Sequence, residues 1–277
     1  MIYAVNYSDL NFKAKQKLNT NSALKNGFKK VFEYGPEDLD LDFKKKNEVI
    51  LKEKRGGGYW IWKPYIILKS LEKISEGDYL FYCDSGAIFL KNPMELIDYM
   101  EKNKLDILPF ELPLLEKQWT KRETFEILDC KTKKYMNSNQ ILATYFILKK
   151  TDFTVKFFKE FLDKVQDEKL VTDIKYMTQY KEFIDHRHDQ SIFSLLCKKY
   201  EIIPFVEPTQ YGDYPWLYNQ HKKFIFIESN VNRIHSKKII LSLRKSSLIR
   251  MKIRIFILDI FGESIFNNLR QFKEILK

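Results

Sequence analysis

Asp84 is the residue whose type and place in the chain point most directly to chemistry. It follows the apolar run Tyr79–Cys83 and precedes Ser85 and Gly86, which predicts a strand that ends at the aspartate. Ligands of open α/β sheets bind beyond the carboxyl ends of the strands. A carboxylate there can hold Mg²⁺ or Mn²⁺, which prefer oxygen ligands and often bridge phosphates. An aspartate in an ordinary turn would have the same local sequence, and this alternative stays open.

A second set of candidates lies upstream, in the sequence RGGGYWIWKP that begins at Arg55. Three glycines let a backbone approach a ligand closely, and Arg55 and Lys63 can neutralise phosphate charge. The pattern is neither a Walker loop nor GxGxxG, because no Lys-Ser/Thr pair follows the glycines. Trp60 and Trp62 can stack on a base or a sugar. The alternatives are a flexible glycine turn and tryptophans that pack in the core.

The third group is the run HRHDQ that begins at His186, at the expected start of a helix. Helix N-termini carry partial positive charge and free N–H groups. Asp189 and Gln190 can contact the hydroxyls of a bound sugar, whereas Asp189 can also simply cap the helix. His186 and His188 can chelate zinc, but no nearby cluster supplies the other ligands of a zinc hydrolase.

Alternating strands and helices must position these candidates. The expected strands are Ile2–Val5, Lys30–Tyr34, Tyr79–Cys83, Leu105–Pro109, Ile141–Leu148 and Glu201–Val206. The expected helices are Ala14–Lys30, one with Pro64 in its first turn, one capped by Asn92-Pro93, one capped by Thr151, and Gln190–Tyr200. This alternation predicts a layered α/β fold with a mostly parallel sheet. Asn6 and Tyr7 follow the first strand, on the edge where Asp84 is expected.

Composition indicates a folded protein with an anionic partner. The 277 residues carry a net charge of +11 and are 44% hydrophobic, which is enough for a packed core. The three cysteines have no metal spacing, and we interpret them as reduced core thiols. No apolar run reaches the ~20 residues that span a bilayer. We therefore expect a cytoplasmic protein.

The composition changes after Ser236. From Lys237 to Arg254 there are basic residues interleaved with Ile, Leu and Met and no acidic residue. This predicts a catalytic domain over residues 1–236 and a basic amphipathic segment over residues 237–277. That segment suits the anionic inner face of the cytoplasmic membrane. A C-terminal helix that packs its apolar face on the core is the alternative, and both can hold together.

Taken in order, RGGGYWIWKPYIIL, GDYLFYCDSG and HRHDQSIFSLL resemble GT-A nucleotide-sugar glycosyltransferases, above all bacterial enzymes of capsule and lipopolysaccharide assembly. The likeness spans roughly residues 1–236. It implies a Rossmann-like α/β fold of the GT-A class, with a mixed, mostly parallel sheet flanked by helices and, here, a C-terminal basic helical appendage. The family's Asp-x-Asp metal motif falls on Asp84-Ser85-Gly86, so Gly86 stands where the second acid is expected. A late histidine completes the metal shell in related enzymes, and His235 is the matching position, with a surface histidine as the alternative.

The resemblance also implies roles for the candidate residues. A Mn²⁺ or Mg²⁺ ion would bind Asp84 and His235. The catalytic residues would be Asp189, Gln190 and His188, with Asp185 as a further candidate base. The donor would be a nucleoside diphosphate sugar, with a UDP-sugar favoured. Its binding residues would be Asn6, Tyr7, Arg55, Tyr59, Trp62, Lys63, Asp84, Ser85 and Gly86.

We therefore predict a hexosyltransferase-type enzyme that adds a sugar to a glycan or lipid-linked glycan acceptor during capsule, lipopolysaccharide or lipooligosaccharide synthesis. The likeness of HDQ to motifs of retaining families favours retention of configuration. A basic nucleic-acid-binding protein is the alternative from another class. It is not expected, because the basic residues form no recognition module. A non-catalytic GT-A-like assembly partner is the third possibility, which the missing acid at Gly86 keeps open.

Overall fold

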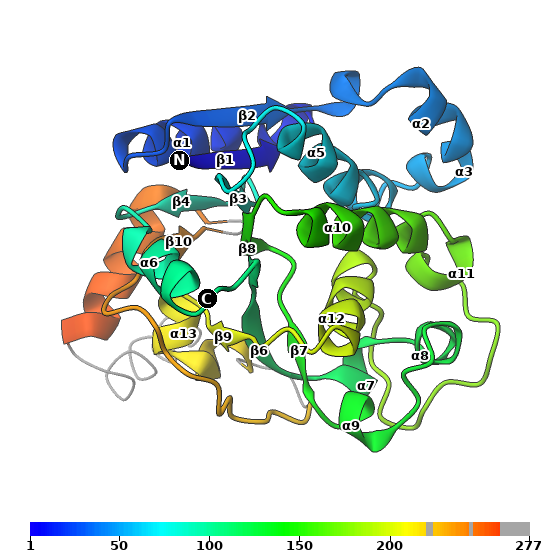
Figure 1. Cartoon of the computed structure of the whole chain (residues 1–277). Coiled ribbons are helices and arrows are strands. Elements are labelled where there is room, and N and C mark those ends of the chain that lie inside the picture. The colour runs from blue at the N-terminus through cyan, green and yellow to red at the C-terminus, as the bar shows by residue number, and fades with distance from the viewer. Residues whose placement is uncertain (220–223, 244–245, 261–277) are drawn as a thin grey trace, which may run out of the picture.

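The computed structural model of the chain describes residues 1–219, 224–243 and 246–260. At its centre is a sheet whose strands follow one another in space as β2-β1-β3-β8-β5. These strands are β1 (Ile2–Tyr7), β2 (Lys30–Tyr34), β3 (Tyr79–Cys83), β5 (Ile107–Leu108) and β8 (Tyr145–Lys149). β1 pairs in parallel with β2 and β3, whereas β8 runs antiparallel to β3 and β5. The predicted mixed, mostly parallel sheet is thus confirmed (Figure 1).

Helices cover both faces of this sheet (Figure 1). They are α1 (Lys13–Lys25), α5 (Trp62–Leu71), α6 (Met94–Lys102), α10 (Asp152–Val165) and α12 (Asp189–Lys199). Successive side chains of a strand point to opposite faces. Ala4 accordingly joins a buried cluster with Ala23 of α1, while Val5 joins another with Ile67 of α5 and Phe193 of α12. The helices therefore form two layers around the sheet, as predicted.

Two smaller sheets extend this core. One has the order β7-β6-β9, and the other pairs β10 with β4. Their strands are β4 (Ala87–Phe89), β6 (Phe110–Leu115), β7 (Asn139–Ile141), β9 (Phe205–Val206) and β10 (Ile240–Ser242). The remaining short helices are η1 (Leu10–Phe12), η2 (Pro36–Asp38), α2 (Leu41–Lys46), α3 (Glu48–Leu51), α4 (Gly56–Tyr59), α7 (Glu116–Trp119), α8 (Arg122–Ile127), α9 (Lys133–Met136), α11 (Glu168–Val171), α13 (Gln210–Asp213) and η3 (Pro215–Tyr218).

The helix starts agree only in part with the predicted caps. Thr151 caps α10, because its side chain accepts a hydrogen bond from the backbone N–H of Thr154. Asp189, expected as a cap, is instead the first residue of α12, and His188 holds the capping position with φ of 50°. The Asp189 carboxylate accepts a hydrogen bond from the Lys63 Nζ.

The segment after Ser236 is not a helical appendage throughout. Ile240–Ser242 forms β10, antiparallel to β4, because this aliphatic stretch is buried beside the sheet. Residues 248–260 are helical, and Met251, Ile255 and Leu258 pack on the core with Leu241. The core-packing alternative therefore holds for part of the predicted basic segment. Its remainder, residues 261–277, lies outside the described residues.

Candidate functional site

A cavity of about 850 Å³ lies beyond the carboxyl ends of β1 and β3. It is lined by residues 7–9, which begin with the last residue of β1, and by residues 84–86, which follow β3. The two strands are parallel neighbours, so their carboxyl ends meet at the same edge of the sheet. The predicted position of the site at this edge is therefore where the structure has its cavity.

Asp84 lies on the wall of this cavity, with its carboxylate partly exposed. Its Oδ1 accepts a hydrogen bond from the Tyr82 hydroxyl at 2.5 Å and is 3.9 Å from the Lys63 Nζ. Burial raises the pKa of Asp84 above its ordinary value. The Ser85 hydroxyl donates to the carbonyl of Tyr7, which ties the ends of β3 and β1 together. A Cβ built on Gly86 meets nothing within 4 Å, so packing does not exclude a second acid there.

The structure separates His235 from Asp84. β10 runs antiparallel to β4 with Ser242 opposite Ala87, so the residues before Ile240 lie beyond the other end of β4. The His235 ring is buried against the carbonyl of Val206, and this burial lowers its pKa. The proposed metal pair of Asp84 and His235 therefore does not form.

The other histidines and acids that the structure describes do not replace that pair. Among the described residues, no group of three or more His, Cys, Asp or Glu side chains could hold a metal ion. The described part of the chain thus does not provide the metal centre that the resemblance implies, nor does it supply a third ligand for a zinc site with His186 and His188. Asp84 is the one predicted ligand that faces the cavity.

The three glycines form a left-handed turn on the cavity rim. Five consecutive residues, 56–60, have φ between 53° and 88°. A Cβ on Gly58 would lie 2.8 Å from the Cα of Leu51, and a Cβ on Gly56 would overlap the ring of Trp60. Tyr59 and Trp60 are not glycines, and each bears a conformational cost of about 1–2 kcal/mol in this region. The glycine run is thus a constrained turn rather than a flexible one, and Gly56, Gly57 and Trp60 line the cavity.

Aromatic side chains form one end of the cavity. The rings of Tyr7 and Trp62 stack with their centroids 3.8 Å apart and their planes at 15°. Both line the cavity, together with Phe12, Pro36 and Leu39. The Trp62 indole N–H donates to the carbonyl of Gly56, which fixes the ring against the turn. A flat apolar ligand such as a nucleobase fits this end.

Lys63 and Asp189, both predicted to contact the donor, are bonded to each other below the cavity. Lys63 Nζ donates to Asp189 Oδ2 at 2.5 Å and to the carbonyl of Ala143 at 2.9 Å. The two side chains are only 3% and 5% exposed, and neither lines the cavity. Burial raises the pKa of Asp189 to about 6, although Lys63 opposes this shift. Gln190, the next residue, does line the cavity, and its amide donates to Gln140.

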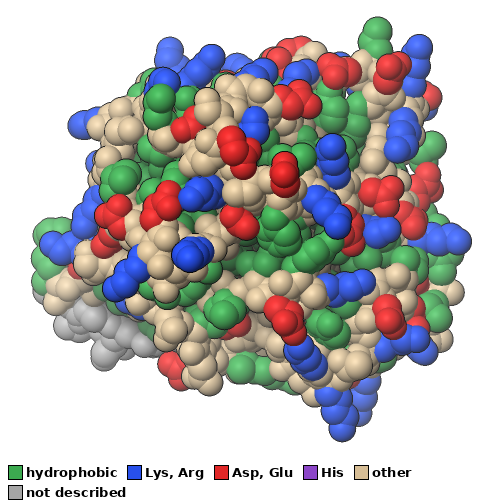
Figure 2. Space-filling view, in the orientation of Figure 1, with side chains coloured by type: hydrophobic (Ala, Val, Ile, Leu, Met, Phe, Trp, Pro, Cys, Tyr) green, Lys and Arg blue, Asp and Glu red, His purple; other side chains and the backbone are tan. Residues whose placement is uncertain are grey.

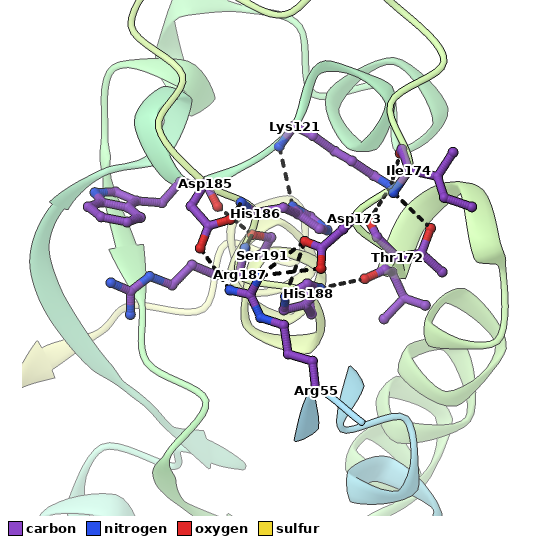
Figure 3. Close-up of polar contacts among 12 residues, drawn as sticks. Arg55, Lys121, Thr172, Asp173, Ile174, Asp185, His186, Arg187, His188 and Ser191 are labelled. Atoms are coloured by element: carbon purple, nitrogen blue, oxygen red, sulfur yellow. Dashed lines mark hydrogen bonds and ion pairs between the residues drawn. The ribbon is translucent and has the colours of Figure 1, made fainter. Parts of the chain in front are cut away.

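Arg55 is also paired rather than directed at the cavity. Its guanidinium donates to Asp173 at 3.1 Å and to Asp185 at 2.7 Å (Figure 3). His188 is buried behind these groups, with its Nδ1 2.7 Å from the carbonyl of Val171. Burial lowers the pKa of His188 to about 4, so the ring is neutral near pH 7. Neither Arg55 nor His188 lines the cavity, so the structure places neither at the predicted phosphate or base position.

Two further predicted donor contacts are interior residues. The Asn6 amide is fully buried and donates to Asn19 and Thr20, which anchors α1 on β1. Tyr59 is buried, and its ring contacts that of His188 at a tilt of 32° with the centroids 4.5 Å apart. Of the predicted donor residues, the cavity is lined by Tyr7, Trp62, Asp84, Ser85 and Gly86.

Sequence reasoning missed the cations of the cavity. Lys44, Lys52, Lys54 and Arg187 line it, and the Arg187 guanidinium lies 4.4 Å from the ring centroid of Trp119. Arg187 sits inside the HRHDQ run, which was a usable signal. The lysines come from a charged stretch that is typical of a solvated surface, and nothing local marks them.

Two further tyrosines belong to the cavity wall. Tyr145 and Tyr218 line the cavity, and both hydroxyls donate to the buried carboxylate of Glu207. Glu207 thereby fixes where the two phenol rings face. Tyr218, which is half-buried, offers a flat surface of the kind that stacks on sugar rings, whereas the ring of Tyr145 is buried.

No family model matches this chain, and neither does any curated protein. Among solved structures, the apo form of mouse xyloside xylosyltransferase 1 is similar with a TM-score of 0.47 and 13% identity, over 87% of this chain and 97% of that one. The glycosyltransferase GlyE of Streptococcus pneumoniae TIGR4 is similar with a TM-score of 0.46 and 11% identity, over 99% and 64%. The galactosyltransferase LgtC, in complex with donor and acceptor sugar analogs, gives 0.44 and 14%, over 87% and 86%. These are partial likenesses at low identity, and the roles assigned below rest on this chain's own geometry.

Proposed function

We propose that this protein is a glycosyltransferase that moves a sugar from a nucleoside diphosphate sugar to a glycan acceptor. The observation that carries the proposal is the cavity at the carboxyl ends of β1 and β3, which has an aromatic end, a strand-end aspartate and several cations. An aromatic wall suits a base, and cations suit a diphosphate. A nucleoside diphosphate sugar combines these chemistries in one ligand.

We propose one orientation of the donor along the cavity. The base lies at the end formed by Tyr7, Trp62 and Phe12, and the diphosphate lies towards Lys54 and Arg187. The sugar then lies near Asp84 and Gln190, and the acceptor enters past Tyr145 and Tyr218. The base preference for uracil and the identity of the sugar and acceptor remain predictions from the family resemblance, as does a place in capsule, lipopolysaccharide or lipooligosaccharide synthesis.

In the reaction, the bond between the anomeric carbon and the phosphate oxygen breaks, and its electron pair leaves with the nucleoside diphosphate. An acceptor hydroxyl oxygen bonds to that carbon, and its proton passes to an oxygen of the departing phosphate. The cavity's cations oppose the charge that develops on the departing phosphate, and the Gln190 amide and Asp84 carboxylate orient the sugar. No step is assigned to a metal ion, because the ligand set of the implied metal centre is incomplete.

We keep retention of configuration as the proposed stereochemical course. An inverting enzyme needs a base on the acceptor hydroxyl. The predicted bases His188 and Asp189 are buried away from the cavity, and Asp185 is bonded to Arg55. The described carboxylates that line the cavity are those of Asp9, Glu48 and Asp84. In the proposed donor orientation, Asp84 contacts the transferred sugar.

The experiment is a panel of nucleoside diphosphates and their sugars, tested by calorimetry and by hydrolysis or transfer to glycan acceptors. Asp84→Asn should keep nucleoside diphosphate binding within a few-fold and lower turnover by at least ~100-fold, a size typical of lost transition-state contacts. Asp98→Asn, an exposed aspartate of α6, is the matched control and should behave as wild type. Arms with Mn²⁺ and with a chelator measure cation dependence. Wild-type protein that binds no donor of the panel overturns the proposal, and binding without turnover favours the non-catalytic alternative.

We also propose peripheral contact with an anionic membrane through residues 248–260. Exposed Ile249, Ile253, Phe256 and Ile260 recur at helical spacing on the side opposite the residues that pack on the core. Arg250 and Lys252 of the same helix are basic and exposed, as expected for a helix at an anionic surface. In the described residues, no helix is long and apolar enough to cross a bilayer.

Vesicle sedimentation tests this contact. Full-length protein should bind vesicles that contain phosphatidylglycerol more strongly than pure phosphatidylcholine. The double variant Ile253→Ser, Phe256→Ser should lose most of that binding, while Leu41→Ser, another exposed apolar residue, should not. Equal binding by all three proteins contradicts the membrane contact and leaves the enzyme proposal intact.

No observation favours nucleic-acid binding. On the face of the molecule drawn in Figure 2, Lys and Arg side chains are interspersed with Asp and Glu rather than gathered into one basic patch.

A further inference from the structure

The left-handed turn of residues 56–60 needs support from outside itself. Its backbone hydrogen bonds, such as those from Gly58 N–H to the Glu53 carbonyl and from Trp60 N–H to the Gly56 carbonyl, reach only residues close by in the chain. Glycine tolerates this conformation, but two of the five residues are aromatic and disfavour it. Such a conformation persists only when its surroundings hold it in place.

Arg55 connects this turn to the segment that leads into α12. Its guanidinium reaches Asp173 with Nη1 and Asp185 with Nη2, so one planar group joins two carboxylates (Figure 3). The ring of His188, the residue before α12, contacts the ring of Tyr59 at a centroid distance of 4.5 Å and lies 5.7 Å from the ring of Trp60. The turn and the start of α12 therefore touch through an ion pair and through ring contacts.

Contacts other than those with Arg55 also hold the two carboxylates in place. Buried Lys121 donates through Nζ to the carbonyls of Thr172 and Ile174, which flank Asp173 on both sides (Figure 3). The backbone N–H of Lys121 donates to Nδ1 of His186, the residue after Asp185. The backbone that carries Asp173 and Asp185 is therefore held by contacts that do not involve Arg55.

Residues on both sides of these contacts line the cavity. Gly56, Gly57 and Trp60 line it on the turn's side, and Arg187 and Gln190 line it at the start of α12. We propose that Arg55, clamped by Asp173 and Asp185, is a positioning residue that keeps these two walls at their spacing, and is not a ligand of the donor phosphate. The inference builds on the proposed function, since it concerns how the same cavity holds its donor.

The alternative is that Arg55 leaves the acids and contacts the diphosphate. The two roles give opposite signs for the variant Asp185→Asn. A phosphate ligand would be released by losing its competing acid, so nucleoside diphosphate binding would tighten. A positioning residue would lose its anchor, so binding would weaken. The roles also differ for a ligand without phosphate, which only positioning can affect.

Calorimetry with UDP and with uridine shows whether each variant binds these ligands more tightly or more weakly than wild type. Arg55→Gln and Asp185→Asn should each weaken UDP and uridine binding by a similar factor, about 5–10-fold. The double variant should be no worse than either single one, because both remove the same connection. Arg55→Lys should rescue only partly, since an ammonium lacks the planar fork that reaches two acids. Arg233→Gln, which removes an ion pair to Asp213 of similar exposure elsewhere, is the matched control.

Hydrogen exchange of the free protein gives a readout that does not depend on any ligand. In both Arg55→Gln and Asp185→Asn, the amides of residues 56–60 should exchange faster, while those of the β1–β3 sheet stay unchanged. Tighter UDP binding by Asp185→Asn, with uridine binding unaffected by either change, overturns the proposal. So does unchanged exchange in the turn. Failure of wild-type protein to bind UDP or any other nucleotide counts against the enzyme proposal alone, because the exchange result still decides the role of Arg55.

Discussion

Arg55 and Lys63 flank the glycine turn and form ion pairs with acids near the start of α12, yet in opposite environments. The Lys63 side chain is 3% exposed and its partner Asp189 is 5% exposed, whereas Arg55, Asp173 and Asp185 are each more than 40% exposed. Water screens the outer pair and is excluded from the inner one. The inner pair therefore cannot lose one member without leaving a buried charge, while the outer pair can open at little energetic cost.

The inner pair therefore contributes to the stability of the fold, whereas the outer pair affects the geometry of the site. The inner pair joins α5 to α12 beneath the cavity floor and is part of the folded core. The outer pair adds little to the free energy of unfolding but determines where the turn lies. Each expected result below tests this contrast, in order of decreasing size.

Replacing Lys63 by Met should have the largest effect. It leaves the Asp189 carboxylate buried without a partner, so the free energy of unfolding should fall by roughly 3–5 kcal/mol. The penalty should be smaller at pH 5 than at pH 8, because Asp189, with its pKa already raised to about 6, is then protonated. Chemical denaturation measures both. Adding Asp189→Asn to the variant should recover much of the loss, and an undiminished loss in the double variant would contradict the assignment.

The His188 ring should make stability depend on pH with an intermediate effect. Its pKa is about 4 in the folded state against 6.5 unfolded, so the unfolded chain takes up a proton first as pH falls. The free energy of unfolding therefore keeps its full value above pH 6.5 and falls by at most about 3 kcal/mol towards pH 4 on account of His188. The facing groups are Arg55, Asp173, Asp185 and the ring of His186.

Thermal unfolding of wild type and His188→Phe between pH 7.5 and 5 isolates this contribution. The phenyl ring keeps the ring contact with Tyr59 but cannot take up a proton, so the variant should lose less stability on acidification. Asp189 acts in the opposite direction, since its raised pKa favours the folded state below about pH 6. Only the difference between the two proteins is therefore diagnostic. Parallel pH profiles would show that His188 is not the group responsible.

The smallest change in stability is expected for Arg55→Gln. Its partners are half-exposed, and such pairs contribute up to about 1 kcal/mol. Urea denaturation should give a midpoint close to that of wild type, although the same variant binds UDP more weakly. A loss of stability as large as that of Lys63→Met would break the contrast between the two pairs.

Local sequence was sufficient for the framework of the site. The strand Tyr79–Cys83 and the aspartate after it were predicted at the right residues, as was the helix that Thr151 caps. Apolar runs and capping residues act over a few positions, so their signal is contained in the local sequence. Ile240–Ser242 was read as helical, because a short aliphatic run does not distinguish a helix from a buried strand.

The pairing of charges was not predictable in the same way. His235 matched a metal position by its order in the chain, yet the antiparallel register of β10 on β4 carries it away from Asp84. Lys54, on the other hand, comes from a charged stretch and reaches the cavity through the path of the chain before the glycine turn. Spacing along the chain says little about distance between side chains on different elements.

The sequence by itself determined where the strand with Asp84 ends and that three glycines must allow an unusual turn, because both follow from backbone preferences of neighbouring residues. Only the tertiary structure decided that Lys63 and Arg55 are bonded to acids while Lys54 and Arg187 line the cavity. The partner of a charge depends on which segments the fold brings within a few ångströms, and that is a property of the packed chain.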